Sequence, residues 1–120
     1  MLLRFALPLA ALAAAAAVAS SALAAPAATK LVGTVGPGFT ITLKDGTGKV
    51  VKALKAGSYT IVVNDKASIH DFHLTGPGVD KTTTVAGMGT QTWNVTLKKG
   101  KYHYQCDPHS TSMFGNFTVT

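Results

Sequence analysis

Residues 92–97 read Thr-Trp-Asn-Val-Thr-Leu, and this stretch decides the fold class. Large apolar side chains alternate there with Thr or Asn, which is the two-residue period of a strand with one buried and one wet face. The same alternation occurs in residues 39–43, 59–63 and 117–120, and β-branched and aromatic residues are frequent in all four segments. The pattern predicts these buried positions: Phe39, Ile41 and Leu43; Tyr59, Ile61 and Val63; Trp93, Val95 and Leu97; Phe117 and Val119.

Turn signals rich in Gly, Pro, Asn and Asp separate the alternating segments. They are Gly36-Pro37-Gly38, Asp45-Gly46-Thr47-Gly48, Ala56-Gly57, Asn64-Asp65, Gly76-Pro77-Gly78, Gly87-Met88-Gly89 and Lys99-Gly100. No stretch after residue 29 shows a helical period. Seven or eight short strands joined by such turns predict an all-β fold, an antiparallel sandwich or barrel.

The N-terminal residues have the layout of a secretory signal peptide. A single Arg4 precedes a long Ala-rich apolar stretch, and Ala22-Leu23-Ala24 is a suitable cleavage site. We therefore expect a signal peptide at residues 1–24, a short linker at 25–29 and one domain at 30–120. The alternative is an uncleaved membrane anchor, but a core made mostly of Ala is only weakly lipophilic. The expected product is exported to the periplasm or outside the cell, with no stable membrane insertion.

The only cysteine of the chain is Cys106. Cleavage after Ala24 would leave 96 residues, and a domain of this size buries only about 60–65% of its unfolded surface. Small secreted domains commonly compensate with disulfides, which a single cysteine cannot form within the chain. An unpaired thiol in an oxidising compartment needs an occupant, so Cys106 is the most informative residue.

The charges favour a basic surface and argue against a nucleic-acid partner. After cleavage, ten Lys against five Asp leave a formal charge of +5, with no Arg and with the lysines spread along the chain. Arg is the side chain that reads phosphates and bases with two parallel hydrogen bonds. We expect a monomer whose basic surface steers a protein partner with an acidic docking surface.

A dense group of metal-binding residue types lies near the C-terminus. Cys106, His109 and Met113 fall within eight residues, at the predicted end of a strand and in the loop that follows. A thiolate, an imidazole and a thioether together suit copper, and such a site needs a second imidazole. His70 supplies a candidate at the corresponding end of another predicted strand. Because it shares the strand parity of Phe72 and Leu74, it is preferred over His73, which points to the surface or to a supporting position.

This pattern resembles the cupredoxins, the plastocyanin/azurin family of blue copper proteins. The resemblance covers essentially the whole mature chain and rests on Cys106, His109, Met113 and Gly115, with His70 upstream. It implies a Greek-key β-sandwich, one copper ion held by His70, Cys106, His109 and Met113, and transport of single electrons without enzymatic turnover. Two positions depart from the family pattern. Asp71 replaces the usual Asn that joins the ligand loops, and Gln105 replaces the aromatic residue that precedes Cys in plastocyanins.

Other interpretations of the same residues stay open at this stage. The same ligands would serve copper capture or delivery, and two His and one Cys plus a further donor can also bind zinc in a tetrahedron. Cys106 and His109 form a possible thiolate–imidazole nucleophile pair, although no orienting third group or oxyanion-hole motif is evident. A buried structural thiol or a purely structural sandwich leaves the grouping of Cys106 with His109 and Met113 unexplained.

Overall fold

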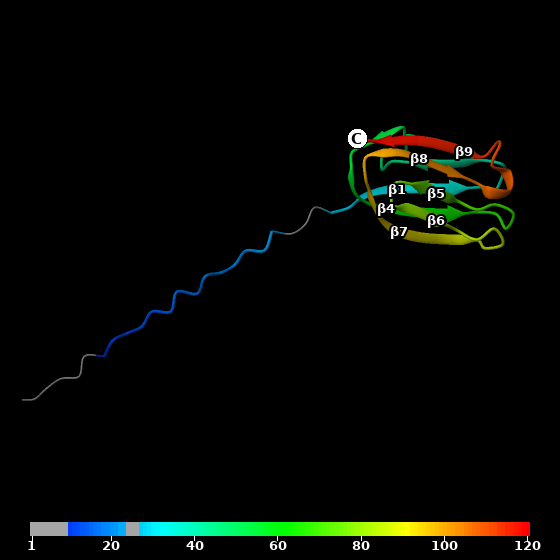
Figure 1. The fold of residues 1–120 in the computed structure, drawn as a ribbon. Coiled ribbons are helices and arrows are strands. Elements are labelled where there is room, and N and C mark those ends of the chain that lie inside the picture. Colours follow the sequence, from blue (N-terminus) through cyan, green and yellow to red (C-terminus); the bar gives the residue numbers. More distant parts are fainter. Residues whose placement is uncertain (1–9, 24–26) are drawn as a thin grey trace, which may run out of the picture.

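The computed structural model describes residues 10–23 and 27–120, and the sandwich lies within the second range (Figure 1). The predicted signal peptide lies outside the described residues at 1–9 and 24, and the predicted linker does so at 25 and 26. A single turn of 3₁₀ helix, η1, covers Asp107–His109. The strands are β1 (Thr29–Val35), β2 (Ile41–Lys44), β3 (Ala53–Leu54), β4 (Gly57–Asp65), β5 (His73–Gly76), β6 (Val79–Thr82), β7 (Gly89–Leu97), β8 (Gly100–Gln105) and β9 (Phe114–Val119).

The strands form two packed sheets, as the sequence predicts for an all-β sandwich. The four-stranded sheet has the order β2-β1-β4-β7, and the five-stranded sheet has the order β3-β9-β8-β5-β6. Two pairings are parallel, β1 with β4 and β3 with β9, so the expectation of a wholly antiparallel sandwich was wrong in this detail. Alternation identifies the buried face of a strand but does not give the direction of its neighbour. The long connection through residues 36–56 gives β4 room to return alongside β1.

The described residues contain nine strands, against the seven or eight expected. The strand β3 has only two residues, which is too short to show a period. Phe39 was also assigned to a buried strand face, and this was wrong. The strand β2 begins at Ile41, and Phe39 is 64% exposed. The turn that starts at Gly36 extends to Thr40, because the Gly36 N–H donates to the Thr40 carbonyl.

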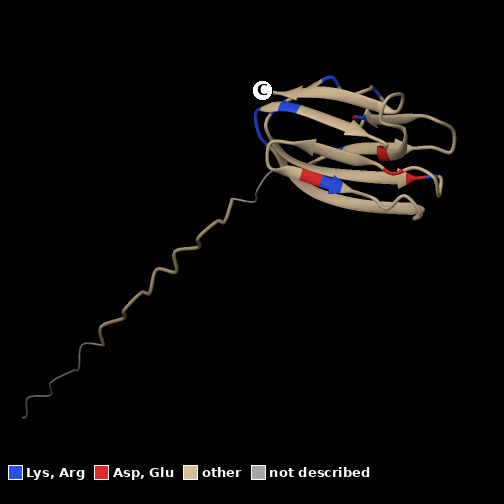
Figure 2. Cartoon of the chain, turned by 45° about the vertical axis from the view of Figure 1, so that its right-hand side comes forward, with Lys and Arg blue, Asp and Glu red and all other residues tan. Residues whose placement is uncertain are grey.

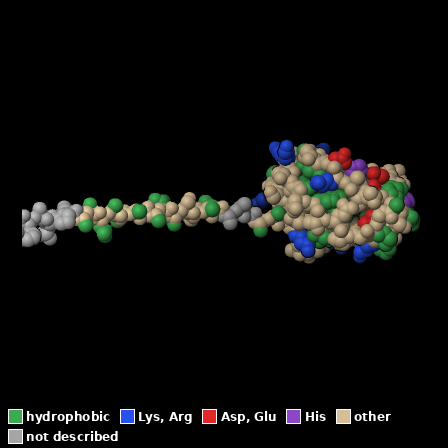
Figure 3. Space-filling view, turned by 90° about the horizontal axis from the view of Figure 1, so that it is seen from below, with side chains coloured by type: hydrophobic (Ala, Val, Ile, Leu, Met, Phe, Trp, Pro, Cys, Tyr) green, Lys and Arg blue, Asp and Glu red, His purple; other side chains and the backbone are tan. Residues whose placement is uncertain are grey.

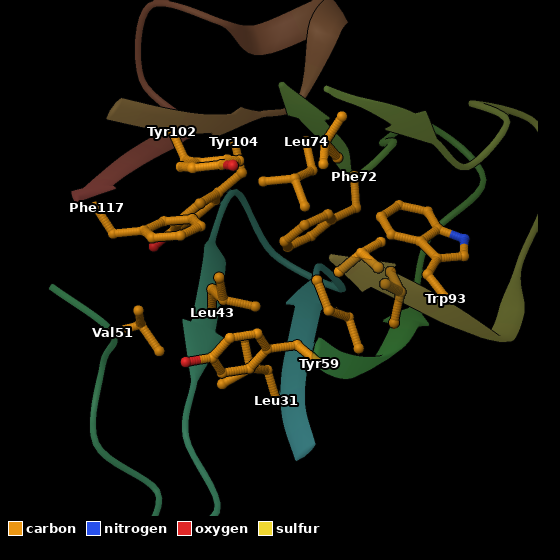
Figure 4. Packing of buried hydrophobic residues seen from close by; sticks show 14 of the residues in the cluster. Leu31, Leu43, Val51, Tyr59, Phe72, Leu74, Trp93, Tyr102, Tyr104 and Phe117 are labelled. Carbon is orange, nitrogen blue, oxygen red and sulfur yellow. The ribbon is translucent and has the colours of Figure 1, made fainter. Parts of the chain in front are cut away.

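The core between the sheets contains most of the predicted alternating positions, together with buried residues such as Leu31 and Val51 that were not among them (Figure 4). The buried faces at Tyr59–Val63, Trp93–Leu97 and Phe117–Val119 are all confirmed. Aromatic rings stack in pairs within it: Tyr102 on Phe117 at 5.1 Å and Phe72 on Tyr104 at 5.4 Å between ring centroids. Each large apolar side chain removed from water contributes about 1.5–3 kcal/mol, and the core supplies this without a disulfide.

Strand directions give the sandwich two different ends. The strand β7 runs toward Lys98 and Lys99, and β8 runs back from there to Cys106. Both the start of β1 and the end of β9 lie at the lysine-bearing end, opposite Cys106 (Figure 1). Basic residues are found at turns of this end (Figure 2), yet the visible lysines are spread over the face in Figure 3 and do not form one patch.

Within residues 10–23 and 27–120, no helix is long and apolar enough to cross a membrane.

Candidate metal centre

The loop from Cys106 to Met113 is held by its own backbone hydrogen bonds. The N–H of Cys106 donates to the carbonyl of Met113 at 2.9 Å, and the N–H of Met113 donates to the carbonyl of His109 at 2.8 Å. The N–H of His109 in turn donates to the carbonyl of Cys106 at 3.0 Å. Pro108 fixes φ at the start of η1 and has no N–H to satisfy. These three hydrogen bonds close the loop on itself and therefore fix the backbone positions from which Cys106, His109 and Met113 extend their side chains.

His70 lies in the connection between β4 and β5. The strand β5 starts only at His73, so His70 precedes the strand on which the parity argument placed it. Its side chain is nevertheless fully buried, as predicted, and so are Asp71 and Phe72 beside it. The N–H of Lys66 donates to the Val35 carbonyl at 2.9 Å and fixes the start of this connection to β1.

Three of the predicted ligands converge on one point. The Nδ1 atoms of His70 and His109 are 3.2 Å apart, and the Sγ of Cys106 lies 3.6 Å from the first and 3.5 Å from the second. A point equidistant from these three atoms lies about 2.0 Å from each, which is close to metal–nitrogen and metal–thiolate bond lengths of roughly 2.0–2.3 Å. The donor atoms therefore fit one metal ion without rearrangement, and within the described chain this is the His/Cys/Asp/Glu group with metal-binding geometry.

Burial shapes the chemistry of the donors. Burial raises the pKa of the Cys106 thiol, and the backbone amides of Asp71 and His109 oppose this shift. A bound cation stabilises the thiolate, because metals bind the deprotonated form. Met113 is buried as well, with 1% of its surface exposed, and its backbone is bonded to Cys106. A soft thioether from this same loop would favour copper over zinc.

Asp71 joins the two ligand-bearing segments. Its Oδ1 accepts the backbone N–H of Asp107 at 2.6 Å, and its Oδ2 accepts the Thr82 hydroxyl at 3.2 Å. Burial is the largest cause of a raised pKa at this carboxyl. Asp71 follows His70 and Asp107 follows Cys106, so one hydrogen bond fixes the spacing of both ligands. The carboxylate thus provides the acceptor needed between the loops, although it replaces the family's amide.

His73 supports the same region from the outside, as its strand parity predicted. Its Nδ1 lies 2.9 Å from Oδ1 of Asp107, and its Nε2 lies 2.6 Å from Oδ1 of Asp80. Burial lowers the pKa of His73, but these two carboxylates outweigh burial and raise it. Burial raises the pKa of Asp107, and hydrogen bonds from Gln105 and His73 reverse this and lower it. The Gln105 amide donates to Asp107 at 2.9 Å, so Gln105 contributes to the loop's support.

One residue of the site was missed by the sequence reasoning. The ring of Phe39 packs on the rings of both His70 and His109, with centroids 5.2 and 5.0 Å away. The alternation with Ile41 and Leu43 had placed Phe39 in the core. The Gly36-Pro37-Gly38 turn directly before it is the signal that would have moved it into a loop.

The fold and this centre define a class of protein: a small β-sandwich with a buried His–Cys–His metal centre at one end. Residues 34–120 match the profile of the copper binding proteins of the plastocyanin/azurin family. The chain belongs to that family. Its cofactor is one copper ion, which the family and the donor set of His70, Cys106 and His109 both support.

Solved structures of rusticyanin resemble this chain in fold. Reduced rusticyanin at 1.9 Å is 21% identical, with a TM-score of 0.56 over 76% of this chain and 78% of that chain. Rusticyanin from Thiobacillus ferrooxidans is 22% identical, with a TM-score of 0.52 over 76% of each chain. The search of curated proteins gave no match. At this level of identity the likeness extends to the fold alone.

Proposed function

We propose that this protein is an exported type 1 copper protein that carries single electrons between redox partners. The proposed ligands are His70, Cys106, His109 and Met113, which would hold a copper ion through two imidazoles, one thiolate and one thioether. The observation that carries the proposal is the triangle of Nδ1, Nδ1 and Sγ atoms, with sides of 3.2, 3.5 and 3.6 Å. Two His and one Cys in a trigonal plane with a distant Met are typical of blue copper electron-transfer sites.

The chain's own residues supply a rigid and dry setting for this task. Copper when bound supplies one-electron chemistry, since it is stable as both Cu(II) and Cu(I). The closed Cys106–Met113 loop and the Asp71–Asp107 hydrogen bond hold the ligands in one arrangement. Because the ligands need not move, little reorganisation accompanies each transfer. The side chains of His70 and Cys106 are both fully buried, with 0% of their surface exposed, so solvent does not reach these two ligands.

His109 is the proposed point of electron entry and exit. It is only partly buried and lies in the loop at the end of the sandwich, beside the exposed Pro108. The partner is proposed to be a redox protein with an acidic docking surface, because ten Lys against five Asp give residues 25–120 a formal charge of +5. We propose that residues 1–24 are removed on export, that residues 30–120 form the functional domain, and that the mature protein works as a monomer in the periplasm or outside the cell.

Copper capture or delivery is the second candidate, because it needs the same donors. The partial exposure of His109 favours this candidate, because a site that takes up and releases copper must be accessible from outside. The two functions differ in rate. A carrier exchanges electrons rapidly between its oxidised and reduced forms and retains its metal, whereas a delivery protein transfers copper readily to an acceptor chelator.

The ligand assignment is tested by adding Cu(II) to the purified protein and recording visible and electron-paramagnetic-resonance spectra. The expected result is an intense blue thiolate-to-copper band that disappears in Cys106→Ser. A band retained in that variant would refute thiolate ligation. Met113→Gln is expected to lower the reduction potential, because a harder donor favours Cu(II), and an unchanged potential would argue against axial ligation by Met113.

A further inference from the structure

Three aromatic rings form a closed cluster at the metal centre. Besides its contacts with the two imidazoles, Phe39 stands at interplanar angles of 73° to His70 and 89° to His109. The imidazoles are 4.9 Å apart at 76° to each other. Every pair in the cluster is therefore edge-to-face, an arrangement that aromatic pairs prefer and that contributes about 0.5–1.5 kcal/mol beyond burial.

In the His70 ring, Nδ1 faces the Nδ1 of His109 at 3.2 Å and the Sγ of Cys106 at 3.6 Å, but within the described chain no hydrogen bond at Nε2 fixes the orientation of the ring. Its Nε2 is buried and has no hydrogen-bond partner among the described residues. A metal-binding His usually donates this second N–H to a carboxylate or carbonyl, which sets the plane of the ring. At His70, packing takes over this task. Phe39 lies against the ring, and a Cβ added to Gly36 would come within 3.3 Å of its Cδ2.

The loop that carries Phe39 is built to hold it over the site. Gly36 has a φ of +73°, a conformation suited to glycine, and its N–H bond to Thr40 closes the turn around Phe39 at 2.9 Å. Phe39 remains 64% exposed, so burial in the core does not explain its position. Its contacts with the two imidazoles do explain it.

We propose that Phe39 is a positioning residue of the metal centre. It holds the imidazoles of His70 and His109 in their ligating orientation and excludes water from their edges. This inference rests on the proposed ligand set and adds to it a residue that binds no metal. The oxidised site carries one more positive charge than the reduced site, so an apolar cover disfavours the oxidised form and keeps the reduction potential high.

The test compares Phe39→Ala and Phe39→Tyr with the wild-type protein, with Phe114→Ala as the matched control. Phe114 is similarly exposed, at 49%, but it stacks on His103 and not on a proposed ligand. At a fixed electrode potential, Phe39→Ala is expected to raise the ratio of oxidised to reduced protein about tenfold, a decrease of about 59 mV for a one-electron couple. Phe39→Tyr, which keeps the ring, is expected to stay near the wild-type ratio, as is Phe114→Ala.

A second readout uses the metal-free protein. The ring signals of His70 and His109 in NMR spectra are expected to broaden or shift toward free-imidazole values in Phe39→Ala but not in Phe114→Ala. Because Phe39 is mostly exposed, Phe39→Ala is expected to unfold at nearly the wild-type temperature.

Two results would overturn the inference. One is a potential in Phe39→Ala equal to that in Phe114→Ala, and the other is unchanged imidazole signals in the metal-free variant. Either result in proteins that still show the blue band leaves the copper-carrier proposal standing. Absence of the blue band from the wild-type protein would instead refute the proposed ligand set, and with it the positioning role of Phe39.

Discussion

Replacing Asp71 with alanine removes the acceptor that joins the two ligand-bearing segments. The lost contact with the backbone N–H of Asp107 is a short hydrogen bond to a carboxylate, and such bonds contribute about 1.5–3 kcal/mol. The second contact, from Thr82, weighs less because that hydroxyl also reaches the Thr83 carbonyl at 2.8 Å. We expect Asp71→Ala to lower the free energy of unfolding by about 2 kcal/mol, or the melting temperature by about 8–16 °C.

Asp71→Asn is the matched control, because it keeps the Oδ1 acceptor for the Asp107 N–H while it removes the charge and exchanges Oδ2, the acceptor of the Thr82 hydroxyl, for an amide donor. Burial raises the pKa of Asp71 above 3.8, so ionisation of this carboxyl costs stability as the pH rises above that value. The amide avoids this cost, and its effect is expected to stay below about 1 kcal/mol. Urea unfolding of the metal-free protein, followed by the fluorescence of the buried Trp93, measures all three proteins. An alanine variant as stable as the wild type, or an asparagine variant as unstable as alanine, would refute the reasoning.

Three other perturbations have defined outcomes. Tyr102→Phe keeps the stacked ring but leaves the Lys98 N–H, now 2.9 Å from the hydroxyl, without that acceptor; a loss of about 1–2 kcal/mol is expected in urea unfolding, with an unchanged copper spectrum. The raised pKa of His73 means that its protonated form stabilises the fold fully below pH 6.5, and that this contribution is lost as the pH rises through the folded-state pKa. A pH series of unfolding curves is expected to show this decline and to lose it in His73→Gln. Removal of copper is expected to lower the free energy of unfolding by about 2.7 kcal/mol relative to protein at 100 times the copper Kd, and equal melting temperatures would contradict binding by the folded state alone.

The buried strand faces could be predicted because apolar residue types mark the buried positions of a strand and polar residue types mark the exposed ones. Trp93, Val95 and Leu97 alternate with polar neighbours, and burial of one sheet face requires that pattern. The grouping of His70, Cys106 and His109 could be predicted because Cys106 and His109 are close in sequence, and a site with their chemistry requires a second imidazole. His70 was correctly placed in the buried interior, although it lies before its strand.

Two of the features that were missed depend on contacts between segments far apart in sequence, and the third, the position of Phe39, depends on a local turn. The parallel pairing of β1 with β4 leaves no mark on the alternation of either strand. Phe39 had the right residue type for a strand, and only the hydrogen-bonded turn around it removes it from the core. The bond between Asp71 and the Asp107 N–H spans 36 residues, and a backbone donor cannot be recognised from residue types.

Both ends of the sandwich domain emerge at the pole opposite the metal centre, where β1 begins and β9 finishes. A tether attached at either terminus, such as a fused enzyme or a peptide linker to an electrode, would therefore leave the His109 end facing outward. In the same layout, an N-terminal extension joins the domain at the end opposite the metal centre. The length of the linker would then set how frequently the His109 end encounters its electron donor or acceptor, with no change in the metal site itself.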